Sequence, residues 1–353
     1  MINGKISIIR FFELFLIVLL FKTSFMRIAK IILLFILLSN PAFSQKINYN
    51  IPEGYEKEVS KSDYKTIVDK AVEMIKEKYT VDFVKDGEVH LKAGYEMSVF
   101  NLHNLIGKCV DLTDKSKWSD VIMEHFNNIF ISIDEQKKID PSNFETVKKY
   151  LSLRIYPEGT VQAKGAISKF IARVDLEGTY TLLMLDLPGA FKTVEKEMFT
   201  LWQKDTAEVF KIAQYNINKQ QVEKITREFD ADSNKIEISF IGNEDYAASY
   251  ALDLMNNSPE LLGEWGSVLA IPNKGLVDIC KVSKEKPVDF VNFIRFTHAI
   301  VDQYFQQHAQ PVSNQFFWYY KGKFTRITVV IDDKQNVNVV APFGLMTLMT
   351  ENK

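Results

Sequence analysis

The chain has 353 residues, of which 46% are hydrophobic and 12% aromatic, and it carries a net charge of −2. This length and apolar content suffice to bury a sizeable core without disulfide or metal cross-links. Residues 1–44 hold five cationic residues and one acidic residue, so 38 cationic and 44 acidic residues follow them, a net charge of −6. Binding to nucleic acid or to anionic lipid needs concentrated basic residues, and the composition therefore argues against both functions.

Residues 26–44 have the layout of a secretory signal peptide. Two cationic residues precede an uninterrupted apolar run of eight residues, Ile31–Leu38, and small residues precede a cleavage point ahead of Gln45. A helix that spans a membrane needs roughly 20 apolar residues, so this run is too short to be one. We expect the mature protein to begin at Gln45, to contain no membrane span, and to be periplasmic or secreted.

The residues before Met26 leave two interpretations of the N-terminus open. Residues 11–21 form a further apolar segment that Glu13 interrupts. Either translation begins at Met26, or the extra segment makes a long leader or an uncleaved anchor. We favour a start at Met26, because residues 26–44 alone make a complete signal peptide of ordinary length.

Two cysteines, Cys109 and Cys280, follow the leader. An oxidising compartment would allow a disulfide between them, but free cysteine is among the residue types most often buried. Cys280 lies in an apolar, strand-like run, which suits burial. We therefore expect two unbridged thiols, and the sequence predicts neither a metal site nor a cofactor, because histidines at ligand spacing are missing.

After the leader we expect a tether and two folded parts. Residues 45–61 are polar and contain a proline and a glycine, as in a tether. The segment around Pro141 is the expected boundary between an N-terminal part, residues 62–140, and a C-terminal part, residues 141–353.

The N-terminal part is predicted to combine helices with a hairpin. Asp86-Gly87 lies between two short runs of alternating polarity, which is the pattern of a β-hairpin with a tight turn. Apolar residues at helical spacing predict helices over residues 62–75, 99–106 and 118–130.

The C-terminal part is strand-rich, and its strands come in pairs joined by turns. The predicted turns lie at Glu177-Gly178, Asn273-Lys274-Gly275, Lys321-Gly322-Lys323 and Lys334-Gln335. Helical periodicity appears at residues 194–214, 246–255 and 287–308. Paired strands interleaved with helices predict an antiparallel α+β fold and not a doubly wound parallel sheet.

Several segments in this order resemble one family. They are "MSVFNLHNLI", "LSLRIYP", "GTYTLLMLDLPGAFKTVEKEMFTLW", "GNEDYAASYALDL", "GSVLAIPNKGLVDICKV" and "FFWYYKGKF". Over residues 79–330 the chain resembles the YtpQ-like bacterial proteins, a family of domains of unknown function. The resemblance therefore implies no activity.

The chain also departs from the family pattern. Where the family tends to read Gly-Tyr-Asp-Ala-Ser, this chain has Asp245-Tyr246-Ala247-Ala248-Ser249, and where the family tends to carry an acid it has Gly275. Any chemistry that depends on those acids would be missing here. Most family members look cytoplasmic, so the leader would make this chain an exported branch.

Short catalytic motifs are missing from the sequence. None of the five histidines has a second histidine four residues away for zinc, and no Gly-x-Ser-x-Gly string occurs. His298 and His308 share a helical face, where we expect two half-buried histidines beside a core stripe.

Arg154 lies in an otherwise apolar predicted strand, where burial of an unpaired guanidinium would be very unfavourable. We expect it to pair with a carboxylate, and Asp186, at the end of the most apolar strand, is the first choice. Asn216 lies at the end of the predicted helix that follows Asp186 in the chain. The group could be a ligand site or an ion pair that fixes the order of strands, and we favour the ion pair.

The run Phe316–Tyr320 consists of five aromatic residues. Alternation along a strand places Phe316, Trp318 and Tyr320 on one face. That face could be open to a protein partner, a peptide or a glycan, or it could be covered as part of a core, which is the commoner role of large aromatic residues.

These observations predict an exported envelope protein that binds an unknown protein or small ligand and is not an enzyme. The alternative is a hydrolase that acts on an envelope polymer or peptide. A concave pocket where titratable groups meet would favour the enzyme, whereas a flat apolar patch or an open sheet edge would favour the binding role.

Overall fold

The computed structural model describes residues 46–95, 97–163, 167–231, 234–334 and 336–351. The fold is α+β, as predicted, with antiparallel strand pairs in each sheet. The predicted signal peptide lies outside the described residues. The chain divides into two compact units between Asn128 and Ile129, upstream of the expected boundary at Pro141.

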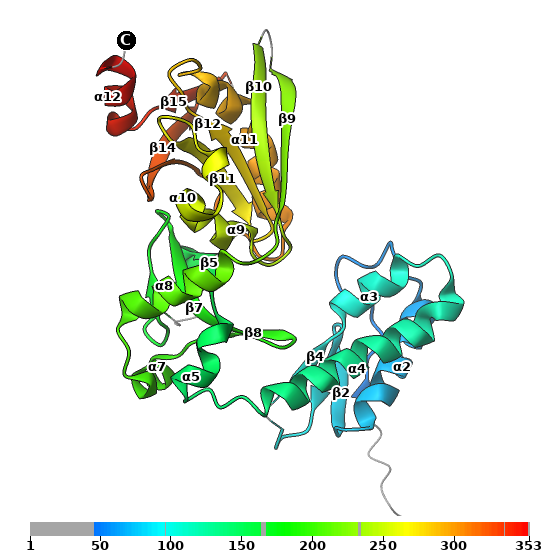
Figure 1. The fold of residues 1–353 in the computed structure, drawn as a ribbon. Helices are drawn as coiled ribbons and strands as arrows, with labels where there is room; N and C mark the ends of the chain where they lie inside the picture. Colours follow the sequence, from blue (N-terminus) through cyan, green and yellow to red (C-terminus); the bar gives the residue numbers. More distant parts are fainter. Residues whose placement is uncertain (1–45, 96, 164–166, 232–233, 335, 352–353) are drawn as a thin grey trace, which may run out of the picture. The chain divides into compact units, whose positions relative to one another are not determined.

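Unit 1 contains a small sheet with the strand order β1-β2-β3-β4 (Figure 1). Its strands are β1 (Lys46–Ile47), β2 (Val81–Lys85), β3 (Glu88–Leu91) and β4 (Val99–Asn101). The helical segments are α2 (Lys61–Lys76), α3 (His103–Val110), the 3-10 turn Lys115–Lys117 and the start of α4 (Trp118–Gln136). The hairpin turn is confirmed, because Asp86 and Gly87 have φ of 51° and 76° between β2 and β3.

Two expectations for unit 1 need correction. The segment 45–61 is not a tether over its described part, because β1 pairs in parallel with β2 and Val59 is buried. The predicted helix 99–106 begins late, because residues 99–101 pair with β3 and the Asn101 side chain accepts a hydrogen bond from the His103 backbone at the start of α3.

Unit 2 contains two sheets. The smaller one has β7 (Thr179–Leu187) between β5 (Leu151–Pro157) and β6 (Ala172–Arg173), with β8 (Ala190–Thr193) also paired to β7. The larger one has seven strands in the order β15-β14-β13-β11-β12-β10-β9. Its strands are β9 (Glu223–Ala231), β10 (Asn234–Gly242), β11 (Ser267–Asn273), β12 (Leu276–Lys281), β13 (Phe316–Tyr320), β14 (Lys323–Ile331) and β15 (Val337–Val340).

The helices of unit 2 connect and cover these sheets. They are α5 (Phe144–Val147), α6 (Glu158–Ala163), α7 (Lys196–Trp202), α8 (Thr206–Ile217), α9 (Ala247–Tyr250), α10 (Leu254–Asn257), α11 (Asp289–Gln307) and α12 (Phe343–Glu351), with 3-10 turns at Lys148–Tyr150, Ala251–Asp253 and Pro259–Leu261. The predicted helix 194–214 is two helices, because Gln203 adopts a left-handed conformation and Asp205 caps a new helix.

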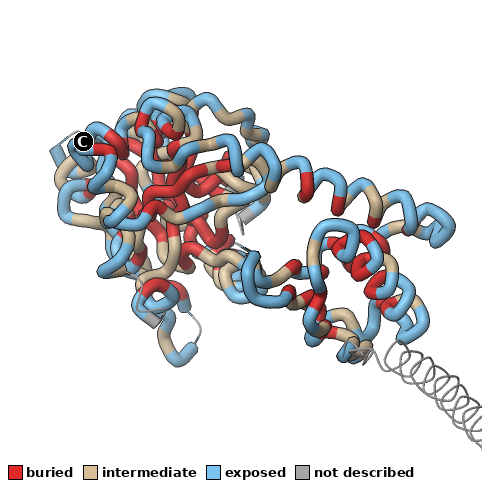
Figure 2. Tube along the Cα trace, turned by 90° about the horizontal axis from the view of Figure 1, so that it is seen from below, coloured by how far each residue is buried: buried red, intermediate tan, exposed pale blue. Residues whose placement is uncertain are grey.

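Strand alternation divides the core of unit 2 between the two faces of the seven-stranded sheet. One face, which includes Leu269, Ile279 and Phe317, packs with residues of β5, β7 and α8. The opposite face, which includes Val268 and Cys280, packs against α11 and α12. Buried segments accordingly gather in the interior, as Figure 2 shows, and the large sheet is covered on both sides.

Gly266 generates a prediction about this packing. It has φ of +80°, and an added Cβ would lie 2.1 Å from the backbone oxygen of Tyr319. Gly178 has φ of +81° with open space around it, and is the matched control. We expect Gly178→Ala to destabilise the fold by about 1 kcal/mol through backbone strain, and Gly266→Ala by roughly 3 kcal/mol because overpacking adds to the strain. Denaturant unfolding of both variants tests this, and equal losses would contradict it.

Candidate functional site

A group of polar side chains from distant parts of the sequence meets in unit 2. We call it the Arg154 cluster, and it consists of Arg154, Asp186, Asp245, Tyr246, Lys274 and Gln310. They come from β5, the end of β7, the loop between β10 and α9, the turn between β11 and β12, and the segment after α11. The cluster therefore joins the small sheet to one end of the large sheet.

Arg154 is the centre of the cluster and is only 7% exposed. Its Nη2 donates to Asp245 Oδ1 at 2.6 Å, and its Nη1 donates to Gln310 Oε1 at 2.5 Å. The guanidinium carbon lies 3.8 Å from the centroid of the Phe191 ring, a cation–π contact. Its Nε has no hydrogen-bond partner among the described residues. The guanidinium is thus held on several sides, and its Nε–H has no acceptor among the described residues.

Asp245 links the two cations of the cluster. Lys274 Nζ donates to the same Oδ1 at 2.8 Å. The backbone N–H groups of Asp245 and Tyr246 both donate to Asn243 Oδ1, which fixes the loop that carries them. Burial opposes ionisation of Asp245, but hydrogen bonds from Lys274 and Arg154 outweigh it, so the pKa of Asp245 lies below its usual value.

Asp186 behaves in the opposite way. Its Oδ2 accepts a hydrogen bond from the Tyr246 phenol. Burial raises the pKa of Asp186 above its usual value, and the negative charge of Asp245 adds to this rise. Burial and the bond to Asp186 also raise the pKa of Tyr246, which keeps the phenol protonated. The cluster therefore holds two carboxyl groups with opposite protonation tendencies, an arrangement that can exchange protons with a bound molecule.

The prediction that Arg154 pairs with a carboxylate is confirmed, but the choice of Asp186 was wrong. The partner is Asp245, because the Asn243 turn brings this side chain to the guanidinium, whereas Asp186 is engaged by Tyr246. Asn216 lies outside the cluster, and its amide donates to the backbone oxygens of Lys148 and Leu151.

The segments around Asp245 and Gly275 are neighbours in space. The Asn243 backbone N–H donates to the Gly275 oxygen at 3.1 Å, beside Asp245 and Lys274. Gly275 therefore borders the Arg154 cluster, to which Asp245 belongs. Nothing in the sequence alone relates residues 154 and 245, which are 91 residues apart in the chain.

The aromatic strand does not present an open face. Phe316 and Trp318 are 3% and 6% exposed and belong to the core that α11 and α12 cover. Tyr320 is partly buried and stacks on Trp318 with ring centroids 5.1 Å apart. Trp318 Nε1 donates to the Trp265 oxygen. These side chains are therefore packing residues, and a partner that binds the folded surface does not reach Phe316 or Trp318.

The outer side of α11 has an unusual composition for a solvated helix surface. We call it the α11 outer face, and its exposed residues are Arg295, Phe296, Ala299, Ile300, Gln303, Tyr304, Gln306 and Gln307. Arg295 is the only charged residue among them, and the structure describes all of α11. The Nε of Arg295 donates a hydrogen bond to the backbone oxygen of Val337. When a helix is already packed against a core, an additional exposed apolar stripe is typical of a surface that another molecule covers.

Helix α2 of the same chain shows the usual pattern. Its exposed residues are Lys61, Ser62, Lys65, Thr66, Asp69, Glu73 and Lys76, and most of them are charged. From the sequence alone, both apolar stripes of a helix such as α11 are expected to be buried in the core. The structure shows which of the two faces the sheet and which is exposed.

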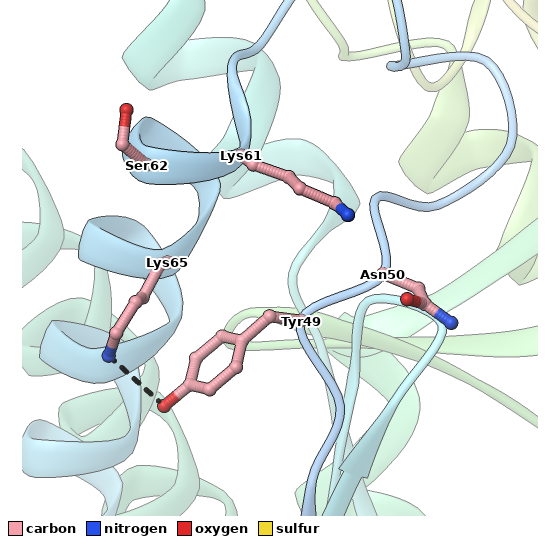
Figure 3. A pocket seen from close by; sticks show the side chains of 5 residues that line it. All are labelled: Tyr49, Asn50, Lys61, Ser62 and Lys65. Carbon is pink, nitrogen blue, oxygen red and sulfur yellow. Dashed lines mark hydrogen bonds between the residues drawn. The ribbon is translucent and has the colours of Figure 1, made fainter.

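Unit 1 offers a shallow polar pocket beside the start of α2 (Figure 3). Tyr49, Asn50, Lys61, Ser62 and Lys65 line it. Lys65 Nζ lies 3.4 Å from Tyr49 Oη and also pairs with Asp69, so its charge is already compensated. The pocket lacks a buried, unpartnered polar group among the described residues and is a weaker candidate than the Arg154 cluster.

The remaining features considered in the sequence are the two cysteines, metal sites and membrane spans. Cys109 and Cys280 are both free and buried, and burial raises the pKa of the two thiols to about 11 and about 12. Among the described residues no group of His, Cys, Asp and Glu side chains is arranged to hold a metal ion. In the same part of the chain, no helix has both the length and the apolar character needed to cross a membrane.

Comparison of the chain with protein-family models, with curated proteins and with solved structures found no match.

The ion pair between the buried Arg154 and the partly exposed Asp245 leads to the second prediction. Arg154→Ala leaves Asp245 partly uncompensated and opens a gap between the sheets of unit 2. The Asp245 side chain is 38% exposed and keeps its bond to Lys274, so we expect a loss below that of a fully buried pair, about 2–3 kcal/mol, which lowers the melting temperature of a unit of this size by roughly 5–10 °C. The matched control is Arg326→Ala, whose exposed pair with Glu177 is worth at most about 1 kcal/mol. Calorimetry of both variants tests this, and similar melting temperatures for them would contradict it.

Asp278 generates the third prediction. It lies on β12, is 3% exposed, and its Oδ1 has no partner among the described residues. Burial raises the pKa of Asp278 from 3.8 to about 7. The folded state therefore holds a proton that the unfolded state releases, and Asp278 destabilises the fold progressively as the pH rises from about 4 to about 7.

We expect Asp278→Asn to remove this loss, so that the variant gains stability over the wild type as the pH rises through that window. Chemical unfolding at a series of pH values measures it. Asp230→Asn, a change at an exposed position of β9, should leave the pH profile as in the wild type. An unchanged profile for Asp278→Asn would show that this carboxyl is not the group that titrates.

Proposed function

We propose that the protein is exported to the periplasm or the exterior and is a binding protein that contacts a protein partner through the α11 outer face. The observation that carries this proposal is the composition of that face. Phe296, Ile300 and Tyr304 are each more than a third exposed and are spaced four residues apart, so they form one stripe along the helix.

Burial of such a stripe by a partner is energetically favourable. Each square ångström of apolar surface removed from water contributes about 25 cal/mol. The centres of protein interfaces are enriched in aromatic residues and poor in charged ones, which matches the α11 outer face. Phe229 on β9 lies with its ring centroid 5.5 Å from that of Phe296, so the apolar surface continues toward the sheet edge.

The rest of α11 supports a rigid binding surface. Its inner side is anchored by Phe290, Phe293, Ile294 and Val301, all buried against the seven-stranded sheet. A helix fixed in this way loses little conformational entropy when its outer side is covered. The proposed YtpQ-like relationship of residues 79–330 adds no activity to this role.

An alternative function is a hydrolase that acts on an envelope polymer or peptide. The observation in its favour is the Arg154 cluster, where Asp186 with a raised pKa lies near the ionised Asp245. Two carboxyl groups of this kind can act as acid and base. Such an enzyme would release fragments from purified envelope polymer, and Asp186→Asn would abolish the release. The binding role requires neither outcome.

The fourth prediction tests the binding role in the cells that export the protein. A photoreactive phenylalanine analogue placed at position 300 should form a covalent adduct on illumination, because Ile300 lies in the middle of the stripe. The same analogue at Leu201, which is 62% exposed on α7, is the matched control and should form no adduct. The mature chain recovered from the envelope or medium should begin at Gln45.

Failure to form an adduct at position 300, or equal adducts at positions 300 and 201, would overturn the binding proposal. Recovery of a cytoplasmic chain that still begins at Met1 or Met26 would overturn the proposed export.

A further inference from the structure

The Arg154 cluster holds more positive charge than its own carboxylates neutralise. Arg154 and Lys274 are both cationic, and both donate to one oxygen of a single carboxylate, Asp245 Oδ1. The other carboxyl group, Asp186, accepts a hydrogen bond from the Tyr246 phenol, and burial raises its pKa, which favours the neutral form. One of the two cations is therefore left without a counter-charge inside the cluster, and an added anion would be stabilised there.

A buried donor of the guanidinium indicates where such an anion would bind. Arg154 is more than nine-tenths buried, and its Nε–H has no acceptor among the described residues. A buried donor without an acceptor is energetically unfavourable, especially on a charged group. A guanidinium binds a carboxylate through two parallel N–H bonds, but Asp245 accepts from Nη2 only. The Nε–H is thus available to an oxygen atom of another molecule.

Lys274 supplies further donors on the side of the cluster that reaches water. An ammonium group has three N–H donors, and the only acceptor of Lys274 Nζ among the described residues is Asp245. The side chains of Lys274 and Asp245 are 18% and 38% exposed, so a molecule can approach from this side. Because Lys274 and Arg154 both contact the same oxygen of Asp245, the two cations are close enough for one small anion to reach both.

The surroundings of the guanidinium favour a flat anion with a single charge. The Phe191 ring covers one face of the guanidinium, with its centroid 3.8 Å from the guanidinium carbon, and the Tyr246 ring lies 5.9 Å from that of Phe191. The uncovered edge of the guanidinium matches the two coplanar oxygens of a carboxylate. A phosphate dianion would bring two negative charges to a cluster that lacks one. Shape and charge therefore both point to a carboxylate.

From these observations we propose that the Arg154 cluster is a binding site for a carboxylate group, which the Nε–H of Arg154 and the ammonium of Lys274 hold. The group belongs either to a small free acid or to the C-terminus of a peptide, because both present the same atoms. None of these side chains belongs to the α11 outer face, so the proposed site is separate from the surface proposed for a protein partner.

Calorimetric titration of the purified chain with two probes tests this inference. The probes are acetate and acetyl-trialanine, whose only carboxylate is its C-terminus, and the controls are acetamide and acetyl-trialanine amide. We expect saturable binding of at least one carboxylate and none of either amide. Binding of acetate alone would identify a small acid as the ligand class, and binding of the peptide alone would identify a peptide C-terminus. Failure of both carboxylates to bind, or equal binding of the amides, would overturn the inference.

A change of one cation assigns the binding to this cluster. Lys274→Met removes the charge that lacks a counter-ion and leaves the pair of Arg154 and Asp245 in place, so the chain should fold as the wild type does. We expect it to lower the affinity for the carboxylate at least about ten-fold, through the lost charge-assisted hydrogen bond.

Lys224→Met is the matched control. Lys224 is also partly exposed and is paired with Glu260 at 2.8 Å, outside the cluster, so its loss should leave the affinity unchanged. Equal affinities for the wild type and Lys274→Met would show that the carboxylate binds elsewhere and would overturn the inference. Neither result bears on the photo-adduct at position 300, so the binding role of the α11 outer face stands or falls separately.

Discussion

The burial of one guanidinium constrains the arrangement of unit 2. Arg154 lies in the middle of an otherwise apolar strand and is almost completely removed from water. An unpaired charge there would destabilise the fold by several kcal/mol, so its partners must converge on it. Asp245 and Gln310 do so from the large sheet and from the segment after α11. These bonds and the hydrophobic core that the two sheets share hold the small sheet against the end of the large one.

This arrangement gives the two sides of the large sheet different roles. The side toward β5 and α8 carries the Arg154 cluster at its end, and the opposite side is covered by α11 and α12 (Figure 1). Helix α11 packs its inner side on the sheet and leaves outside a partly apolar side whose one exposed charged residue is Arg295. The polar cluster therefore stabilises the scaffold, and the helix on the other side supplies the surface that we propose for binding.

Much of the fold follows from local patterns. The Asp86-Gly87 turn, the strand pair around Asn273–Gly275 and helix α11 are each determined by residues close together in the chain, and the structure contains all of them. Strand β9 was not predicted, because charged residues interrupt its apolar ones as suits a solvent-exposed sheet edge. Helix α12 was also missed, since its apolar residues follow no clear stripe.

The site was harder to predict than the fold. The sequence identified Arg154 because a charge in an apolar strand needs a partner, but it could not identify Asp245, whose approach depends on how two sheets meet. Alternation correctly assigned Phe316 and Trp318 to one face of a strand, yet it gives no information on what covers that face. The sequence likewise could not show that Ile300 is exposed, because only the packing of the folded chain shows which of the two apolar stripes of a helix is buried.

The claim on which the other structural conclusions depend is that Arg154 and Asp245 are directly coupled. A double-mutant cycle with Arg154→Ala and Asp245→Ala measures this coupling as the difference between the double variant and the sum of the single ones. We expect a coupling free energy of about 1–3 kcal/mol, and a smaller one for the cycle of Arg154→Ala with Asp186→Ala. Additive effects for Arg154 and Asp245, within about 0.5 kcal/mol, would contradict the claim that this pair holds the two sheets together.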